Sequence, residues 1–363
     1  MAASTCTLPG EVANAITQFL PDLVGDAAMA QRRTRFGFLE SLRSPINRNG
    51  RADIRYDQGN SKTREVDIFY TPRAPDSFVA TSRSSTCETT NERGQIKDSV
   101  SVSLTAQYSE VIQDCYVRQI EQGKTEWLKE LLSGAWNTIG RQIETTLITS
   151  AATQFGINAS TGNANVITKT ILDAAADEQP QISVWNGFMD TEMEDANEFQ
   201  GMPIIVGQGA ISRFMKTQQW ACCSDLGFDF AAAMRSPDMG AWYFKSQLTN
   251  SAIATDRCLV YEPGALQLLT YHRNRGQGTD IVFDNNGAYG AYNDNAGDSA
   301  GLIVDPINGI VYDMDVVYDK CSRETSIFLT LCYDLWVMPS DQLDATDPLY
   351  GVNGLYNYKF QSA

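Results

Sequence analysis

The sequence predicts an α+β fold, in which one long helix and several groups of strands occupy separate stretches of the chain. Apolar residues recur at helical spacing from Thr125 to Phe155, which predicts the helix. Apolar and polar residues alternate between Ala52 and Tyr108 and again between Ile310 and Val337, as they do in strands with one buried face. With 363 residues, 43% of them apolar, the chain can form two or three compact units or one elongated subunit with subdomains.

The first fifty residues are expected to form an arm with short helical pieces. Apolar side chains in Glu11–Leu20 have helical spacing, and Pro21 ends that piece. Gln31–Leu42 are expected to add one or two basic turns before Pro45.

Residues 51–108 combine short alternating runs with a stretch that has almost no large apolar side chains. Three runs within it alternate with period two: Ile54 and Tyr56; Val66, Ile68 and Tyr70; Val100, Val102 and Leu104. A long polar stretch, Thr71–Asp98, separates the second run from the third, and such an excursion indicates function or disorder. A two-stranded ribbon this polar is not stable alone in water. We therefore expect it to lie on something else, with a neighbouring subunit as the first candidate.

The helix predicted over Thr125–Phe155 would be about 45 Å long at 1.5 Å per residue. Thr125 is its expected N-cap, and Gly156 is expected to end it. The positions expected to be buried are Leu128, Leu131, Leu132, Ala135, Trp136, Ile139, Ile143, Leu147, Ala151 and Phe155. The remaining positions carry polar residues: Glu126, Lys129, Glu130, Asn137, Arg141 and Glu144.

The rest of the chain predicts a mixed α/β part followed by a hairpin. The expected helices are Val166–Ala176, Met189–Phe199, Ala210–Thr217 and a turn from Pro263 to Leu269; the expected strands are Ile182–Trp185, Gly201–Val206 and Cys258–Tyr261. Asp284–Gly301, rich in Asn, Gly and Asp, is expected to be a loop. Ile310–Tyr318 and Ile327–Val337 alternate on either side of a short polar connection, which predicts an antiparallel pair.

The net charge of −16 argues against a nucleic-acid-binding protein, because such proteins carry a basic footprint. The charge is uneven, since residues 31–97 are basic whereas 173–198 and 305–319 are acidic. Such runs either form solvated surface or give neighbouring copies complementary charge. One acidic set shares a strand face and is expected to be solvated or to face a basic partner or a cation: Asp313, Asp315 and Asp319.

No catalytic, cofactor-binding or metal-binding residues are predicted. The single histidine, His272, lies in a charged stretch and is expected at the surface. Gly123-Lys124-Thr125 and Gly207-Gln208-Gly209 each lack a glycine that a phosphate-binding loop or a dinucleotide fingerprint requires. The eight cysteines form no Cys-x-x-Cys motif.

The start of the chain has no basic leader or apolar core of a signal peptide, and no apolar run is long enough to span a membrane. We therefore expect synthesis in a reducing cytoplasm with mostly free thiols, and no membrane partner.

Four segments carry a resemblance that the order of elements supports: Trp136–Ala151 (WNTIGRQIETTLITSA), Gly201–Phe214 (GMPIIVGQGAISRF), Cys258–Tyr271 (CLVYEPGALQLLTY) and Asp315–Pro339, which ends in YDLWVMP. The predicted elements follow one another in this order: an arm, a polar two-stranded excursion, a long helix, a mixed α/β unit and a return to long strands. Both features resemble the major capsid proteins of tailed phages with the Hong Kong 97 fold, which encapsulins share.

The resemblance implies a Hong Kong 97-like capsid fold of five parts: an N-terminal arm (1–50), an extended β-hairpin or E-loop (51–108), a peripheral domain with a spine helix (109–157), an axial domain (158–300), and peripheral-domain strands with a C-terminal tail (301–363). It also implies a structural protein and not an enzyme. That protein self-assembles through pentamers and hexamers into an icosahedral shell around phage double-stranded DNA. The arm and E-loop would reach across neighbours, where the candidate contacts to acidic surfaces are Arg55, Lys62, Arg64 and Arg73.

The other partners that the resemblance implies are a portal, a separate scaffolding protein and a decoration protein, with only weak contact to packaged DNA. The implied location is the virion, after a stage in the host cytoplasm. Three alternatives stay open: an encapsulin-type compartment shell, another phage structural protein such as a tail-tube or decoration protein, and, more weakly, a carboxylate-based hydrolase.

Overall fold

A computed structural model of the chain describes residues 36–48, 52–56, 65–70, 96–112, 126–159, 161–162, 167–173, 179–180, 189–199, 201–208, 241–248, 252–254, 256–272, 292–293, 299–305, 309–319, 324–339 and 350–362. These residues divide into two compact units. Unit 1 contains the described residues of 102–143 and 270–334, and unit 2 contains those of 36–101, 144–269 and 335–362. Among the described residues no helix is both long and apolar enough to cross a lipid bilayer.

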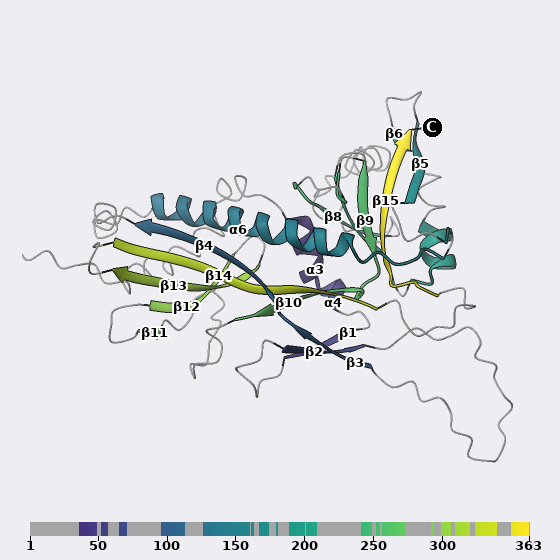
Figure 1. Ribbon diagram of the computed structural model, residues 1–363. Helices are drawn as coiled ribbons and strands as arrows, with labels where there is room; N and C mark the ends of the chain where they lie inside the picture. The colour runs from purple at the N-terminus through teal and green to yellow at the C-terminus, as the bar shows by residue number, and fades with distance from the viewer. Residues whose placement is uncertain are drawn as a thin grey trace, which may run out of the picture. The chain divides into compact units, whose positions relative to one another are not determined.

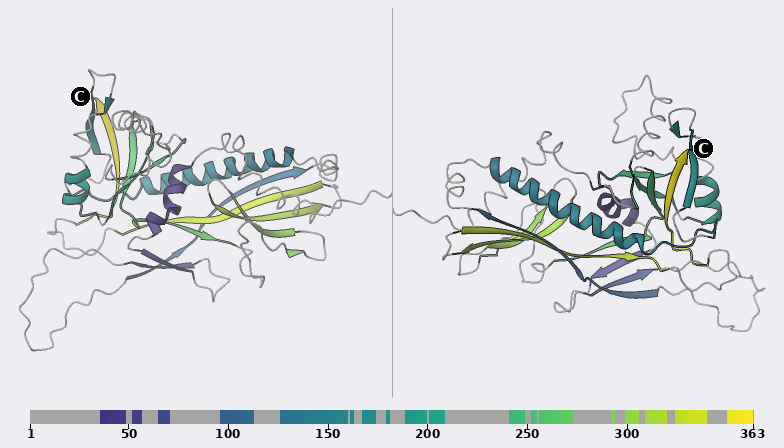
Figure 2. Two further views of the ribbon diagram at one scale, coloured as in Figure 1. Left: turned by 180° about the vertical axis from the view of Figure 1, so that it is seen from behind. Right: turned by 45° about the horizontal axis from the view of Figure 1, so that its top comes forward.

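Unit 1 is built on an antiparallel sheet and the first part of a long helix. The strand order is β10-β14-β13-β12-β11, and β4 also pairs with β14. The bounds are β4 (Leu104–Ile112), β10 (Leu266–Tyr271), β11 (Tyr292–Asn293), β12 (Ser299–Val304), β13 (Val311–Asp319) and β14 (Glu324–Val337). Leu266–Leu269 of β10 and Leu335–Val337 of β14 are counted with unit 2. Helix α6 spans Glu126–Ala152, and its part up to Ile143 lies along β4, β14 and β13 (Figures 1 and 2).

The strand register explains why one face of this sheet is apolar. Met314 of β13 lies opposite Leu329 of β14, which lies opposite Tyr108 of β4, so these three side chains share a face. The buried residues of that face include Ala106, Tyr312, Met314, Val316, Ile327, Leu329 and Leu331. Alternate residues of each strand therefore supply the core, which confirms the antiparallel pair predicted from the alternation.

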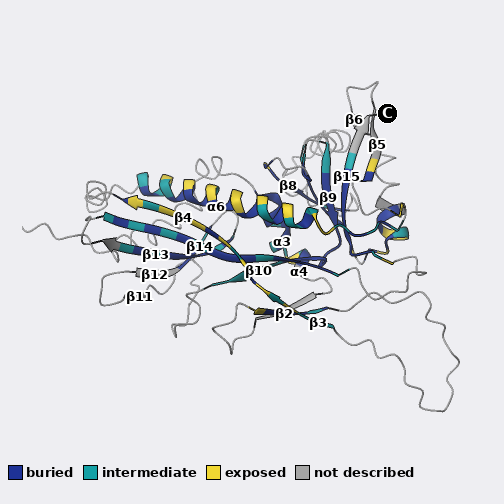
Figure 3. Ribbon diagram, viewed as in Figure 1, coloured by how far each residue is buried: buried dark blue, intermediate teal, exposed yellow. Residues whose placement is uncertain are grey.

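Helix α6 confirms the predicted positions of the buried stripe. Its fully or almost fully buried residues include Leu128, Leu132, Ala135, Trp136, Ile139, Ile143, Leu147 and Ala151. Buried and exposed residues alternate along its length (Figure 3). The helix ends at Ala152, before the predicted Phe155, and at 27 residues it is about 40 Å long.

Unit 2 contains a six-stranded mixed sheet of order β6-β5-β15-β9-β7-β8. The bounds are β5 (Ile167–Asp173), β6 (Gln179–Pro180), β7 (Ile204–Gly207), β8 (Trp242–Lys245), β9 (Arg257–Tyr261) and β15 (Leu355–Ser362). β15 is parallel to β5 and β8 is parallel to β7, whereas the other pairs are antiparallel. The C-terminal residues, which the sequence analysis grouped with the hairpin strands, thus pair inside the sheet of the mixed α/β part.

Unit 2 also holds three short helices and a second sheet. The helices are α3 (Gly37–Arg43), α4 (Pro45–Arg48) and the π-helix η2 (Met189–Ala196), which occupies the predicted acidic helix. The second sheet has the order β1-β2-β3, with β1 at Ala52–Tyr56, β2 at Glu65–Tyr70 and β3 at Ile96–Ser101. Its pairs are antiparallel.

Two predicted helices are wrong. Residues 166–176 were expected to be helical, but Ile167–Asp173 form β5, because its β-branched residues favour a strand and β15 supplies a pairing partner. The helical turn predicted from Pro263 to Leu269 stops early, and Leu266 already begins β10. Short apolar runs of this kind fit a strand and a helix equally well.

The predicted loop 284–301 is wrong where β11 and the start of β12 fall within it. The predicted strand Ile182–Trp185 and the predicted helices at 11–20 and 210–217 lie outside the described residues.

Candidate interaction surface

The four predicted contact residues lie largely outside the part of the chain that the structure describes. Arg55 belongs to β1, where its backbone lies opposite Asp67 of β2. Lys62, Arg64 and Arg73 fall in the undescribed residues that adjoin β2 on either side. Their role as contacts therefore stays a prediction, and the candidate surface consists of the described strands β1, β2 and β3.

The inner face of β2, the central strand of the β1-β2-β3 sheet, is buried within its own chain. Val66, Ile68 and Tyr70 alternate along β2, and all three are buried. The ring of Tyr70 lies 5.5 Å from that of Trp336, the residue before the end of β14. The central strand β2 therefore rests on its own subunit, and the expectation that a neighbouring subunit supports residues 51–108 stays a prediction for the rest of that segment. The period-two apolar residues and a third strand give the sheet enough apolar surface to rest on its own subunit.

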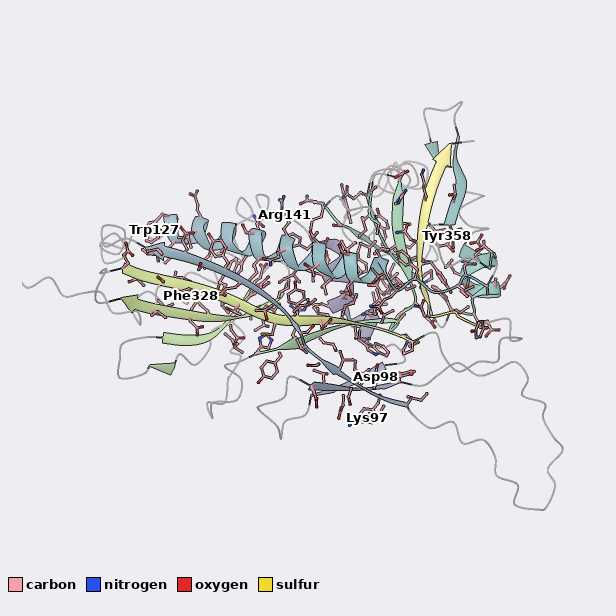
Figure 4. All side chains as sticks on the ribbon, viewed as in Figure 1. Lys97, Asp98, Trp127, Arg141, Phe328 and Tyr358 are labelled. Atoms are coloured by element: carbon pink, nitrogen blue, oxygen red, sulfur yellow. The ribbon has the colours of Figure 1, made fainter. Side chains whose placement is uncertain are left out.

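The outer face of the same sheet is polar. Lys97 Nζ lies 2.7 Å from Asp67 Oδ2, and the hydroxyl of Ser99 donates to Asp67 Oδ1 over 2.7 Å. The hydrogen bonds from Lys97 and Ser99 hold the pKa of Asp67 below its usual value, and they outweigh the opposing effect of partial burial. Lys97 and Asp98 follow one another in β3 and lie on opposite faces of the sheet (Figure 4).

The third predicted run does not continue through this sheet. Val102 is buried, and the backbone N–H and hydroxyl of Ser103 donate to Asp334 Oδ2 over 3.2 and 2.9 Å. Leu104 then begins β4, which pairs with β14 in the sheet of unit 1. Residues 104–108, expected in the excursion, thus belong to a sheet core, because Ala106 and Ile112 meet the buried face of β14.

Residues 36–48, expected in the N-terminal arm, are part of the core of unit 2. Phe36, Phe38 and Leu39 are fully buried. The side chain of Asn47 donates to the carbonyl oxygen of Leu266 over 2.7 Å and accepts from the backbone N–H of Gly264 over 2.9 Å. This end of the predicted arm is therefore held in place by its own subunit.

Two residues of α6 were placed wrongly by the sequence analysis: Leu131, expected to be buried, is half-buried, and Glu144 is buried. Glu144 was expected on the polar face, but it is fully buried. Its side chain accepts hydrogen bonds from the Ser246 hydroxyl and, over 3.3 Å, from the backbone N–H of Leu39. Burial raises the pKa of Glu144 to about 7, the negative charge of Glu40 adds a smaller increase, and the hydrogen bonds oppose the rise. Since Phe36 supplies no side-chain cap to α3, Glu144 caps that helix from another element.

A second buried network surrounds η2. The Tyr358 hydroxyl donates to Glu192 Oε2 over 3.1 Å and accepts from the Asn158 side chain over 2.6 Å. The Tyr356 hydroxyl donates to Asn197 Oδ1 over 2.8 Å. These groups satisfy one another's hydrogen-bonding capacity, which is the pattern of a structural link between β15, η2 and the residues after α6.

His272 and Asp313 are less exposed than predicted. Their side chains are 10% and 2% exposed, and His272 Nδ1 lies 3.9 Å from Asp313 Oδ2. Asp313 lies on β13 and is almost fully buried, so the expectation of a solvated side chain is wrong for this residue.

The described residues contain no group of three or more His, Cys, Asp and Glu side chains placed to hold a metal ion. Cys258 and Cys332 are free and buried, and burial raises the pKa of the Cys258 thiol.

Comparison with known proteins gave matches among solved structures. No protein-family model and no curated protein matches the sequence. The capsid asymmetric unit of cyanophage A-1(L) is 11% identical, with a TM-score of 0.47, over 90% of this chain and 92% of that one. The capsid of cyanophage P-SCSP1u is 10% identical, with a TM-score of 0.42, over 87% and 85%. The capsid of a native GTA particle is 12% identical, with a TM-score of 0.41, over 83% and 86%. Over most of its length, the chain is similar to subunits of phage capsids.

Proposed function

We propose that this chain is the major capsid protein of a tailed phage and has the Hong Kong 97-like fold. In this proposal it assembles through pentamers and hexamers into an icosahedral shell that encloses double-stranded DNA. Its function in this proposal is to form the wall of the shell, and no residue acts as a catalyst.

The observation that carries the proposal is the pairing of β4 with β14, two strands that lie far apart in the sequence. β4 precedes α6, and β14 lies more than two hundred residues later, yet Leu104–Ile112 pair with Thr325–Tyr333 over their whole length. The first part of α6 lies along the same sheet, while most of residues 158–269 belong to another unit. A helix-backed sheet interrupted by a separate α/β unit is the element order that the resemblance implies for the peripheral and axial domains.

The five-part division follows from this proposal. In this proposal the arm of residues 1–50 is limited to those before Phe36, the E-loop of 51–108 to those before Val102, and 109–157 is the spine-helix region. The axial domain of 158–300 ends before Thr270 and gains β15 from residues 301–363, whose other described strands close the peripheral sheet. The arm and E-loop contact neighbouring copies, and their candidate contact residues are Arg55, Lys62, Arg64 and Arg73. The net charge of −16 suits a shell that contacts packaged DNA only weakly, because tight phosphate binding would oppose packaging and release.

The partners in this proposal are further copies of the chain, a portal, a separate scaffolding protein and a decoration protein. The chain would be present in the host cytoplasm before assembly and in the virion afterwards. An encapsulin-type shell is the alternative closest in architecture, and it would differ by recruiting a protein cargo in place of DNA.

Sedimentation velocity of the purified chain tests the proposal. A capsid subunit sediments as capsomers or as far larger closed particles, and their share rises with protein concentration. A chain that stays monomeric at every concentration, and hydrolyses a substrate in a broad screen from pH 5 to pH 8, would instead support the carboxylate-based hydrolase.

A further inference from the structure

Asp98 interrupts an otherwise apolar face. On the inner side of the β1-β2-β3 sheet, β3 presents Ile96, Asp98 and Val100, and Asp98 lies opposite the buried Ile68 of β2. The alternation that builds this face predicts an apolar residue where Asp98 stands. Asp98 is half-buried there, and a carboxylate that has lost part of its contact with water is stabilised by a hydrogen-bond donor.

Trp336 supplies that donor. Its indole Nε1–H donates to Asp98 Oδ2 over 2.9 Å. The indole is almost fully buried, and its ring contacts Tyr70 at 5.5 Å with the two planes tilted by 54°. One aromatic side chain from the end of β14 therefore contacts both β2 and β3, through a ring contact to the first and a hydrogen bond to the second.

Apolar burial and the Trp336–Asp98 hydrogen bond restrain the sheet in different ways. Burial of Val66, Ile68 and Tyr70 stabilises the packing of the sheet on its subunit. Because the hydrophobic effect is not directional, it does not by itself fix the position of the sheet along the strand direction. A hydrogen bond between a buried indole and a single carboxylate is directional, and it fixes which residue of β3 lies over Trp336. A slide of two residues would keep the apolar face inward but replace Asp98 by Ile96 or Val100, neither of which accepts the hydrogen bond.

We propose that the Trp336–Asp98 hydrogen bond is a register pin, which sets the position of the β1-β2-β3 sheet on its own subunit and so the direction in which that sheet meets a neighbouring copy. The pin rests on the proposed shell function for its consequence in assembly. Its geometric part concerns the single subunit. Trp336 and Asp98 are positioning residues in this proposal, and neither needs to touch the neighbour.

Three variants separate the pin from general stability. Asp98→Val removes the acceptor and completes the apolar face, so it leaves the subunit folded. Trp336→Phe keeps a buried ring beside Tyr70 and removes the donor. Asp98→Asn is the matched control, because its amide oxygen still accepts the indole N–H.

The subunit readout is hydrogen–deuterium exchange of unassembled protein. In Asp98→Val and Trp336→Phe, amide protection in β2 and β3 falls by about tenfold, while Asp98→Asn stays close to wild type. Unchanged protection in both variants would overturn the pin.

The assembly readout is the diameter distribution of particles in electron micrographs. Wild type and Asp98→Asn give one diameter, whereas Asp98→Val and Trp336→Phe give several diameters and open sheets. Uniform particles from variants that have lost protection would overturn the link to assembly. If wild type forms no particles, the proposed function fails and takes the assembly link with it, while exchange still decides the pin.

Discussion

The hydroxyl of Ser246 donates a hydrogen bond to the buried side chain of Glu144, although the two residues lie 102 positions apart in the chain. Together with the N–H of Leu39, this hydrogen bond makes Glu144 the link between α6, α3 and the residues after β8. A buried carboxylate with raised pKa gives the subunit a measurable dependence on pH.

We expect Glu144 to make the subunit less stable as the pH rises. Its pKa is about 7 in the folded chain and 4.5 ordinarily, so the folded state binds the proton more tightly. The stabilisation from this group is complete below about pH 4.5 and is lost as the pH rises through about 7. Relative to Glu144→Gln, the wild-type free energy of unfolding should fall by about 3 kcal/mol across this window.

Urea unfolding of both proteins across that pH range measures the difference. Glu130→Gln is the control, because Glu130 is exposed on the same helix. A wild-type-minus-variant difference that does not change with pH would contradict the buried, high-pKa assignment.

Two glycines should respond to alanine in opposite directions. A Cβ on Gly37 would lie 2.4 Å from the carbonyl carbon of Lys245 and 2.6 Å from the amide nitrogen of Ser246, and both are backbone atoms that cannot turn away. Gly134 lies exposed in α6 with no atom within 4 Å of its Cβ position. We expect Gly134→Ala to raise the free energy of unfolding by about 0.5–1 kcal/mol, since alanine is the better helix former.

Gly37→Ala should lower the melting temperature, because overpacking at a closed backbone contact costs about 1–3 kcal/mol. Thermal melts followed by circular dichroism compare the two variants directly. Equal shifts in the same direction would show that α3 is not seated against Lys245 and Ser246 as described.

Two buried tyrosines should differ when their hydroxyls are removed. The Tyr243 hydroxyl is buried and has no hydrogen-bond partner among the described residues, whereas the Tyr358 hydroxyl bonds Glu192 and Asn158. Tyr243→Phe should therefore leave the free energy of unfolding unchanged or raise it by about 1 kcal/mol, and Tyr358→Phe should lower it by about 1–3 kcal/mol. Chemical denaturation gives both values, and a larger loss at Tyr243 would contradict the assignment of its hydroxyl.

Adjacent residues of β14 should differ because they point to opposite faces. Leu329 is fully buried in the core of unit 1, and Phe328 lies half-buried on the other face, labelled in Figure 4. Leu329→Ala should destabilise the chain by about 2–5 kcal/mol, because it opens a cavity. Phe328→Ala should cost clearly less although it removes more atoms, and an equal or larger loss would place β14 in the opposite register.

The elements that could be predicted from the sequence are those whose pattern is local. The stripe of α6 and the alternation of β13 and β14 repeat over many residues, so Leu132, Ile139 and Leu329 were assigned to the core correctly. Glu144 was missed because its burial depends on Leu39 and Ser246, both about a hundred positions away. The strand β5 was missed because its partner β15 lies far away in the sequence, near the C-terminus.

The candidate surface was predicted only in part, for a related reason. The alternation in residues 51–108 correctly indicated strands, but Trp336, the residue that anchors them, belongs to a distant part of the sequence. The only local signal was Asp98 itself, a charge at a position where the alternation calls for an apolar residue. A break in an otherwise regular pattern is therefore the feature that could have found this site.

Cryo-electron microscopy of the purified, assembled chain tests the proposed shell most directly. The account predicts closed icosahedral particles in which copies of this chain form rings of five and six around the symmetry axes, with residues 51–101 meeting a neighbouring copy on their outer face. Monomers, open tubes or particles without fivefold vertices would contradict it.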